Sequence, residues 1–341
     1  MCYETPASRN ELVREALAAL READRIVFTT HVNADGDGAG SEVALAAWLM
    51  ATGKRVWVVN PTPFPPSLRF LLPVGVTLLD PGSPAAKEVA DQVDLAVVLD
   101  TGEVPRIGAV SGLIAEVPSL IIDHHPPGDQ PLPGISLRDP GACATGELVY
   151  DILQAAGGPW PPETVKGLYV ALLTDTGSFR FSNTSPATHQ IVADLIGKGA
   201  EPEELFRQAY GNIPLRKLRL LRAALGELEV DPRGDLAWMT VPSNVFLELD
   251  ATPDDIEGLV DYPRDIEGVE VGLLFRETVR GATKVSFRSN GPVDVNALAR
   301  AFGGGGHEKA SGALVDRPIS EVRSEVLEAV RKAIRTGVKN A

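Results

Sequence analysis

Three hydrophobic runs in the first half of this chain each lead into acids and histidines. Arg25 to Thr30 precedes His31, Asp35 and Asp37; Asp94 to Leu99 precedes Asp100; and Ser119 to Ile122 precedes Asp123, His124 and His125. In an open parallel α/β sheet, residues that follow different strands converge outside the carboxyl ends of those strands. The pattern therefore predicts one site that combines carboxylates with three imidazoles, a ligand set suited to divalent metals such as manganese or zinc.

Short apolar runs alternate with helical stretches through the first half, as in parallel βαβ units. Further segments of this pattern are a strand at 55–60 and helices at 11–23, 39–52, 145–156 and 163–173. Thr145 is expected to be the N-cap of its helix. The last hundred or so residues instead predict strands at 235–241, 269–277 and 283–288 and helices at 293–302 and 321–335.

The expected fold class is therefore α/β, with an N-terminal, mostly parallel sheet flanked by helices and a smaller mixed α+β domain after it. We expect the first domain at 1–190, a helical linker at 191–225 and the second domain at 226–341. The active site is expected in the cleft between the domains.

Composition limits the alternatives. No apolar run approaches the roughly 20 residues of a membrane span, the first ten residues lack the features of a signal peptide, and the two cysteines, Cys2 and Cys143, lie far apart. A cytoplasmic protein without disulfides or membrane contact is expected. A formal charge of −14 argues against a protein that binds long nucleic acid by counterion release, although a compact, cation-mediated substrate remains compatible with it.

The segment Asn33 to Gly38 resembles the opening of a calcium-binding EF-hand loop. However, Ala44 stands where such a loop needs its bidentate glutamate, and a strand precedes the segment where a helix should be. A solvated Asp-Gly turn and a metal site both remain open for this segment by itself. His31 favours the metal site, because its imidazole can face the same cation as Asp35.

Asp100 closes a strand, and alone it could be only a turn or capping residue. The run Asp123-His124-His125 is more specific. One of the two histidines can bind a metal while the other faces a substrate, and Asp123 can orient an imidazole by a hydrogen bond.

Taken together, these motifs resemble the DHH phosphoesterase family. The resemblance rests on His31-Val-Asn-Ala-Asp-Gly-Asp-Gly-Ala-Gly-Ser41, Asp100-Thr-Gly, Asp123-His-His125 and Leu173-Thr-Asp-Thr-Gly-Ser-Phe-Arg-Phe181, and in the second half on Phe287-Arg-Ser, Asp294-Val-Asn296 and Phe302-Gly-Gly-Gly-Gly-His-Glu-Lys-Ala-Ser-Gly312. The first domain would then be the DHH domain and the second the DHH-associated, substrate-binding domain. The chain looks most like the bacterial oligoribonuclease and 3'-phosphoadenosine 5'-phosphate (pAp) phosphatase group. It departs from common relatives at Ala34, where they have proline.

The resemblance implies two divalent metal ions, expected to be Mn²⁺. His31, Asp35 and Asp100 would hold one ion, and Asp37, Asp100, His124 and Asp175 the other, with Asp100 bridging. His125 would contact the scissile phosphate or assist proton transfer to the leaving group, with Asp123 as its catalytic partner.

The run Gly303 to Gly306 fits neither a Walker A loop nor a dinucleotide fingerprint. We expect the backbone of Gly304, Gly305 and Gly306 to form an anion cradle with His307 and Arg288. Arg180 is a candidate for a further phosphate contact, and a surface role is open for it as well.

The expected function is hydrolysis of short oligoribonucleotides to mononucleotides and of pAp to AMP. Linear or cyclic di-adenylate is the alternative substrate, and an inorganic pyrophosphatase or a nucleotide sensor without catalysis is less favoured. Expected partners are short single-stranded RNA or nucleotide bisphosphates, not long duplexes, and a homodimer is left open.

Overall fold

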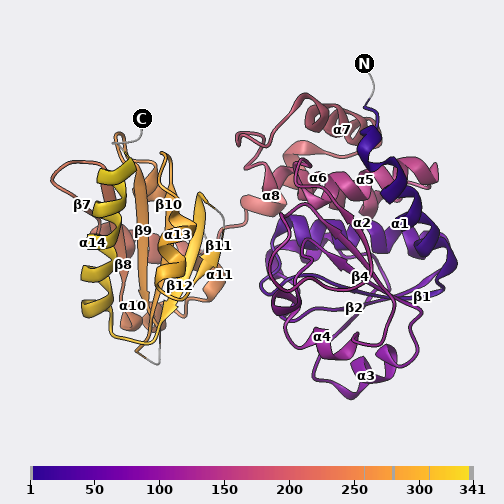
Figure 1. Cartoon of the computed structure of the whole chain (residues 1–341), viewed down its shortest axis with the longest axis horizontal. Helices are drawn as coiled ribbons and strands as arrows, with labels where there is room; N and C mark the ends of the chain where they lie inside the picture. Colours follow the sequence, from indigo (N-terminus) through magenta and orange to yellow (C-terminus); the bar gives the residue numbers. More distant parts are fainter. Residues whose placement is uncertain (1–2, 257, 279–280, 307, 338–341) are drawn as a thin grey trace. The chain divides into compact units, whose positions relative to one another are not determined.

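The computed structural model describes residues 3–256, 258–278, 281–306 and 308–337. The chain forms two compact units, Met1–Asn212 and Ile213–Ala341. Figure 1 shows the elements of both units, coloured along the sequence.

The first unit is built on a six-stranded parallel sheet with strand order β3-β2-β1-β4-β5-β6. Its strands are β1 (Arg25–Thr29), β2 (Arg55–Val59), β3 (Thr77–Leu79), β4 (Leu95–Leu99), β5 (Ser119–Asp123) and β6 (Ile135–Arg138). β1 and β4 lie at the centre, and β5 lies beside β4. The three predicted motifs therefore follow adjacent strands at one edge of the sheet.

Helices cover both faces of this sheet. They are α1 (Asn10–Glu22), α2 (Gly36–Ala51), α3 (Pro84–Ala90), α4 (Val110–Leu113), α5 (Thr145–Ala156), α6 (Pro162–Asp175), α7 (Pro186–Gly197) and α8 (Pro202–Tyr210), with short 3₁₀ helices at Ala7–Arg9, Pro66–Leu71 and Val104–Ile107. The larger core lies between the sheet and α1, α2, α5 and α6, and a smaller core lies on the side of α3 and α4 (Figure 1).

Two glycines bring α2 and α6 close together inside the larger core. A Cβ on Gly40 would lie 2.5 Å from the carbonyl oxygen of Gly167, and a Cβ on Gly167 would lie 2.5 Å from the carbonyl oxygen of Gly40. Only glycine at both positions allows the two backbones to touch. This contact fixes the distance between two helices that each carry a predicted metal ligand.

A buried arginine ties the start of the chain to α5 and the loop before it. The guanidinium of Arg9, which is 4% exposed, contacts Asp139 at 2.5 Å, Glu147 at 2.6 Å and Asp151 at 3.1 Å. Glu147 also accepts a hydrogen bond from the backbone N–H of Cys143. The buried guanidinium is thus paired with carboxylates, as a buried charge must be, and the network holds residues 139–144 against α5.

The second unit contains a mixed six-stranded sheet with strand order β11-β12-β10-β9-β8-β7, in which only the β8–β9 pair is parallel among the described strands. Its strands are β7 (Glu229–Val230), β8 (Leu236–Val241), β9 (Val271–Glu277), β10 (Thr283–Ser289), β11 (Gly305–Gly306) and β12 (Ala310–Val315), and its helices are α9 (Leu215–Gly226), α10 (Ser243–Glu248), α11 (Pro253–Ile256), α12 (Asp261–Arg264), α13 (Val295–Ala301) and α14 (Ile319–Gly337).

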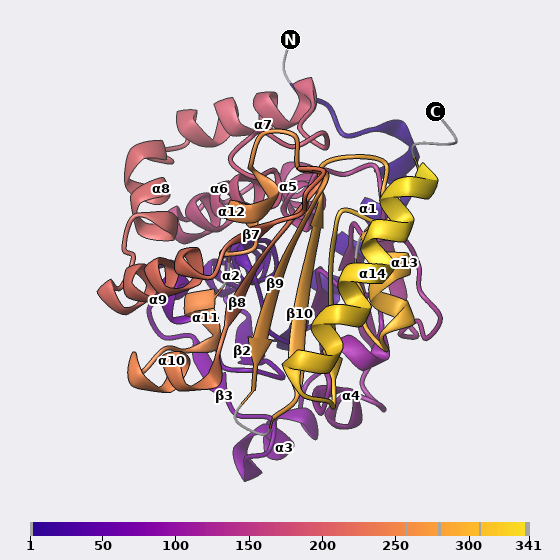
Figure 2. The same cartoon turned by 90° about the vertical axis from the view of Figure 1, so that its left-hand side faces the viewer.

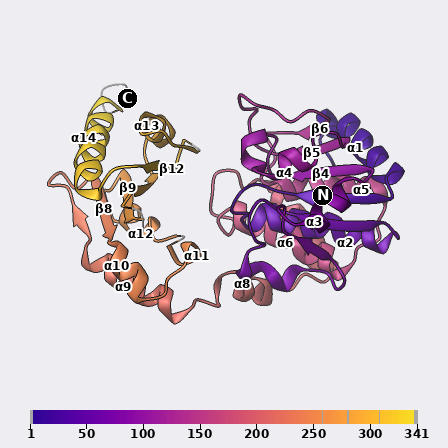
Figure 3. The same cartoon turned by 90° about the horizontal axis from the view of Figure 1, so that it is seen from below.

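Helices also cover both faces of this second sheet. α13 and α14 pack on one face, and the group of α9, α10 and α12 packs on the other (Figures 2 and 3). The predicted fold class, a parallel α/β sheet followed by a smaller mixed α+β unit, is confirmed. The helices that were expected in the linker are divided between the units, with α7 and α8 in the first and α9 in the second.

Candidate metal centre

The loop after β1 brings His31 and Asp35 to the carboxyl edge of the parallel sheet. Asp35 is the N-cap of α2, and its Oδ1 accepts hydrogen bonds from the backbone N–H groups of Asp37 and Gly38. The Nε2 atom of His31 lies 3.8 Å from Asp35 Oδ1 and 3.1 Å from Asp100 Oδ2. α2 begins at Gly36, three residues earlier than predicted, so Asp37 lies in its first turn.

Gly36 and Gly38 allow neighbouring side chains of the site to pack closely against the start of α2. A Cβ on Gly36 would lie 2.3 Å from the Thr174 side chain, and one on Gly38 would lie 2.5 Å from the Thr30 hydroxyl. Both distances are too short for any side chain. The close approach of α2 to its neighbours therefore depends on these two glycines.

Asp37 binds the N-terminus of α5. Its Oδ2 accepts the backbone N–H of Thr145 at 2.7 Å, and its Oδ1 accepts that of Gly146 at 3.0 Å and the hydroxyl of Ser41 at 3.1 Å. Helix N-termini present free N–H groups and attract negative charge. Thr145 is the first residue of α5, and Ala144 is the N-cap, so the predicted capping role of Thr145 is wrong by one residue.

Asp100 lies at the centre of the cluster. It is 1% exposed and adopts a positive φ of 60°, a strained conformation for a non-glycine residue that is common at functional sites. Its Oδ1 accepts the hydroxyl of Thr145 at 3.1 Å. The carboxylate thus has a fixed orientation before any ligand binds.

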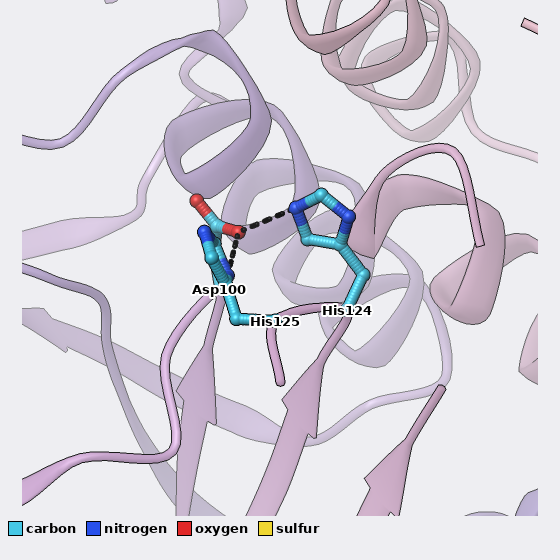
Figure 4. A group of neighbouring side chains, drawn as sticks. All are labelled: Asp100, His124 and His125. Atoms are coloured by element: carbon cyan, nitrogen blue, oxygen red, sulfur yellow. Dashed lines mark ion pairs between the residues drawn. The ribbon is translucent and has the colours of Figure 1, made fainter. Parts of the chain in front are cut away.

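The two adjacent histidines both face Asp100 (Figure 4). Asp100 Oδ1 lies 3.6 Å from His124 Nε2 and 3.5 Å from His125 Nδ1. The imidazoles meet edge to face, with ring centroids 4.5 Å apart. Asp123, the last residue of β5, accepts the backbone N–H of His125 and lies 2.8 Å from its Nδ1.

Asp175 enters the cluster from the last turn of α6. Its Oδ2 lies 3.7 Å from His124 Nε2, and Asp37 Oδ2 lies at the same distance of 3.7 Å from that nitrogen. Asn183 donates hydrogen bonds from Nδ2 to the backbone carbonyl of Asp175 and to its carboxylate. The sequence predicted Asp175 as a ligand, and the structure places it beside the others.

Three overlapping groups of side chains could each hold a metal ion. Within each group, the possible ligand atoms lie within 4.8 Å of one another, and the groups are His31 with Asp35 and Asp100, Asp37 with His124 and Asp175, and Asp100 with His124 and His125. Asp100 belongs to two of them. All eight residues predicted for the metals and the catalytic pair therefore meet at one edge of the sheet.

The charged groups in this cluster shift one another's pKa values. Burial and the neighbouring charge of Asp37 raise the pKa of Asp175 to about 7, and the same two causes raise the pKa of Asp100. Burial by itself would lower the pKa of His31, but hydrogen bonds to Asp100 and Asp35 raise it to about 10. Buried carboxylates and imidazoles at such close range are suited to bind a divalent cation. The cation would displace protons and offset the negative charge of the carboxylates.

Three neighbours of the cluster were not predicted as site residues. They are Thr145, which binds Asp100; Asn183, which binds Asp175; and Arg138, whose Nη2 lies 3.4 Å from Asp123. A Cβ on Gly102 would lie only 1.5 Å from that Nη2 atom, so the glycine of Asp100-Thr-Gly makes space for the arginine. Their residue types carry no signal in sequence, because their roles depend on contacts between distant segments.

The other predicted substrate contacts belong to different segments of the chain. Arg180 is exposed and donates from Nε to the carbonyl of Gly177. Arg288, on β10, lies 3.7 Å from Asp261. Gly305 and Gly306 form β11, and a Cβ on Gly304 or Gly306 would collide with β12, so these glycines also serve close strand packing. His307 lies outside the described residues.

The family comparisons agree with this architecture. Residues 25–173 match the DHH family, N-terminal domain, and residues 240–336 match the DHHA1 domain. With the relatives described next, these matches show that the chain belongs to the DHH phosphoesterase family, as its motifs predicted.

Within this family, the chain resembles proteins named bifunctional oligoribonuclease and PAP phosphatase NrnA. It is 34% identical to the protein of that name from Thermus thermophilus, over 95% of this chain and 94% of the relative. It is 30% identical to the one from Bacillus subtilis, over 88% of this chain and 92% of the relative. A solved structure of an exopolyphosphatase-related protein from Bacteroides fragilis superposes with a TM-score of 0.86 at 27% identity, covering 96% of each chain.

Among the described residues, none of the helices has the length and apolar character needed to cross a membrane.

Proposed function

We propose that this protein hydrolyses short oligoribonucleotides to mononucleotides and converts pAp to AMP. The observation that carries the proposal is the position of Asp100, a buried carboxylate shared by two groups of possible metal ligands. The names of the Thermus and Bacillus relatives supply the substrate class. Both reactions cleave a phosphate ester with water, so one centre can serve both.

Two divalent ions, which we propose to be Mn²⁺, would occupy the cluster. His31, Asp35 and Asp100 would hold one ion, and Asp37, Asp100, His124 and Asp175 the other. Such a pair supplies Lewis-acid chemistry that lowers the pKa of a water molecule and offsets phosphate charge. Mixed carboxylate and imidazole donors are compatible with manganese, whereas calcium and magnesium favour sites made of oxygen alone.

The residues of the chain would orient the reacting groups. Asp123 contacts Nδ1 of His125 and so orients the imidazole, which would contact the scissile phosphate or give a proton to the leaving oxygen. Arg138 binds the other oxygen of Asp123 and so fixes the carboxylate that fixes His125. Thr145 does the same for Asp100.

The second unit would bind a phosphate that does not react. We propose Arg288, the backbone of Gly304, Gly305 and Gly306, and His307 for this contact, with Arg180 as an additional one from the first unit. Losing such a contact should raise KM, because it removes binding energy remote from the reaction. Arg288→Ala should therefore impair a dinucleotide and barely affect a p-nitrophenyl phosphodiester, which has no second phosphate.

Charge favours short substrates in this proposal. A chain at −14 has no general attraction for a long phosphate backbone, so kcat/KM should fall as RNA lengthens and duplexes should be poor substrates. The salt dependence of binding should be shallow, because its slope is roughly 0.7 per phosphate contacted on a single strand. The cytoplasmic location stays a prediction, and the homodimer that the sequence left open can be tested by sedimentation velocity.

The decisive experiment is an assay of the purified chain with Mn²⁺, Mg²⁺, Zn²⁺ or no added metal. The substrates are a diribonucleotide, pAp, linear and cyclic di-adenylate, and pyrophosphate, with RNA of up to about twenty residues as a length series. We expect Mn²⁺-dependent release of mononucleotides from the diribonucleotide and of AMP from pAp. Faster hydrolysis of cyclic di-adenylate or pyrophosphate than of the diribonucleotide and pAp, or equal activity after chelation of the metal, would contradict the proposal.

A further inference from the structure

The segment that follows Asp175, one of the carboxylates of the metal centre, carries an exposed aromatic ring. Phe181 is 49% exposed, and its backbone N–H bonds to the carbonyl of Thr176 at 3.0 Å, so the chain has folded back to the residue next to Asp175. The tip of its ring lies against Gly177, where a Cβ would lie 2.4 Å from Cζ. Burying such a ring in the core would be favourable, yet it remains at the surface.

The backbone of this segment is strained. Three consecutive residues have positive φ angles: Gly177 at 55°, Ser178 at 61° and Phe179 at 65°. Non-glycine residues rarely adopt this conformation, and a large side chain such as that of phenylalanine does so only where the surroundings enforce it. The strained turn places Phe179 and Phe181 in different environments.

Contacts on both sides hold the turn in place. The ring of Phe179 packs against those of Tyr169 and His189, with centroid distances of 6.3 and 5.6 Å. Further along, the side-chain amide of Asn183 bonds to the backbone carbonyl of Asp175 at 3.1 Å. The segment 176–183 is thus closed on itself, and the ring of Phe181 is presented from a rigid frame.

We propose that Phe181 stacks on a nucleobase of the substrate. The inference rests on the proposed function and adds to it a contact with the nucleobase of the substrate. A nucleotide whose phosphate is bound at the metal centre carries its base a few bonds away, and every base has a π-face that an aromatic side chain can stack on without reading its sequence. Stacking would therefore select nucleotides over other phosphate esters while tolerating any base.

The ring of Phe181 has a fixed position before the ligand binds, which favours binding of a small ligand. Phenylalanine has few rotatable bonds, and its frame is closed before the ligand arrives, so little conformational entropy is lost on binding. A short substrate offers few contacts. One stacked base is then a large fraction of its binding energy.

The test compares binding of AMP with binding of ribose 5-phosphate, which has the same phosphate and sugar but no base. Calorimetry with Mn²⁺ present measures both dissociation constants for the wild type, Phe181→Ala and Phe181→Tyr. We expect Phe181→Ala to weaken AMP binding about 5- to 150-fold, the usual effect of removing a stacking aromatic. Ribose 5-phosphate should bind all three proteins equally, and Phe181→Tyr should retain the wild-type affinity for AMP.

Phe206 provides a matched control, because it is 47% exposed on α8 and contacts the ring of Tyr210. Phe206→Ala should leave binding of AMP unchanged. Equal binding of AMP by Phe181→Ala and the wild type, or equal loss of AMP and ribose 5-phosphate, would overturn the inference, as would a wild type that does not bind AMP. Because these are binding measurements, a chain that binds AMP through Phe181 but hydrolyses neither substrate would refute the proposed function alone.

Discussion

The hydroxyl of Thr145 offers a sharp test of how the chain prepares Asp100. Thr145→Val replaces the hydroxyl with a methyl group of similar size. The backbone N–H that binds Asp37 remains, so the substitution removes only the 3.1 Å hydrogen bond to Asp100. Both residues are almost fully buried, at 0% and 1% exposed, and water cannot readily replace the lost donor.

The size of the effect follows from that geometry. A hydrogen bond to a buried charged group contributes about 1.5–3 kcal/mol, which corresponds to about 10- to 150-fold in an equilibrium constant. Substitutions of residues that orient metal ligands cost about 10- to 100-fold in metal affinity or activity. The two estimates agree, so we expect Thr145→Val to bind Mn²⁺ at least tenfold more weakly, about 1.4 kcal/mol.

Calorimetric titration with Mn²⁺ measures the affinity, and kcat/KM for a diribonucleotide measures the consequence. Thr145→Ser keeps the hydroxyl and should restore most of both. Thr164 is the control, because it is equally buried and its hydroxyl donates to the carbonyl of Ala44 at 2.8 Å, in the core. Thr164→Val should cost about 1 kcal/mol of stability without changing metal affinity. If Thr145→Val binds Mn²⁺ within twofold of the wild type, the hydroxyl does not prepare Asp100.

Three further outcomes are expected. Asp100→Asn should lower turnover by more than about a hundredfold while circular dichroism shows an intact fold; near-normal turnover would contradict a shared ligand. Arg9→Met should destabilise the protein by about 3–5 kcal/mol, because it leaves buried carboxylates without a cation, and the melting temperature should fall by about 6–20 °C. This loss of stability should shrink as the pH is lowered toward 4 and the carboxylates become protonated. A loss that does not depend on pH would argue against a charge effect. Metal binding should release protons, because burial lowers the pKa of His31 and His124 but neighbouring carboxylates raise these values to about 10 and 9. The apparent affinity for Mn²⁺ should therefore rise with pH up to about 10. Calorimetry in buffers of different ionisation enthalpy checks the proton count, and release of no protons at pH 7 would be the contrary result.

Sequence reasoning performs well where the signal is local. The runs that become β1, β4 and β5 are continuous and apolar, as strands buried on both faces must be, and the residues after them could be placed at one edge because parallel strands share their direction. β3, β6, β7 and β11 are two to four residues long, too short for a hydrophobic period to appear. β12 begins Ala-Ser-Gly, a composition typical of loops, and its strand conformation depends on pairing with β10.

The supporting residues of the site escaped prediction for a different reason. Thr145 and Asn183 are ordinary capping and loop residues in sequence, and their partners are separated from them by 45 and 8 positions. The two histidines both lie against Asp100, and the expectation that one binds a metal while the other faces a substrate stays a prediction. Side-chain direction depends on packing between segments, which a single sequence does not display.

The Arg9 network also sets an order in which parts of the first unit can fold during synthesis on the ribosome. The guanidinium is synthesised 130 residues before Asp139 and 142 before Asp151. At about 5–20 residues per second, it emerges roughly 7 to 30 seconds before its partners. During that interval the start of the chain cannot occupy its buried position, because a lone cation there would be prohibitively costly. The contacts that bury Arg9 can therefore form only after residues 139–151 have been synthesised.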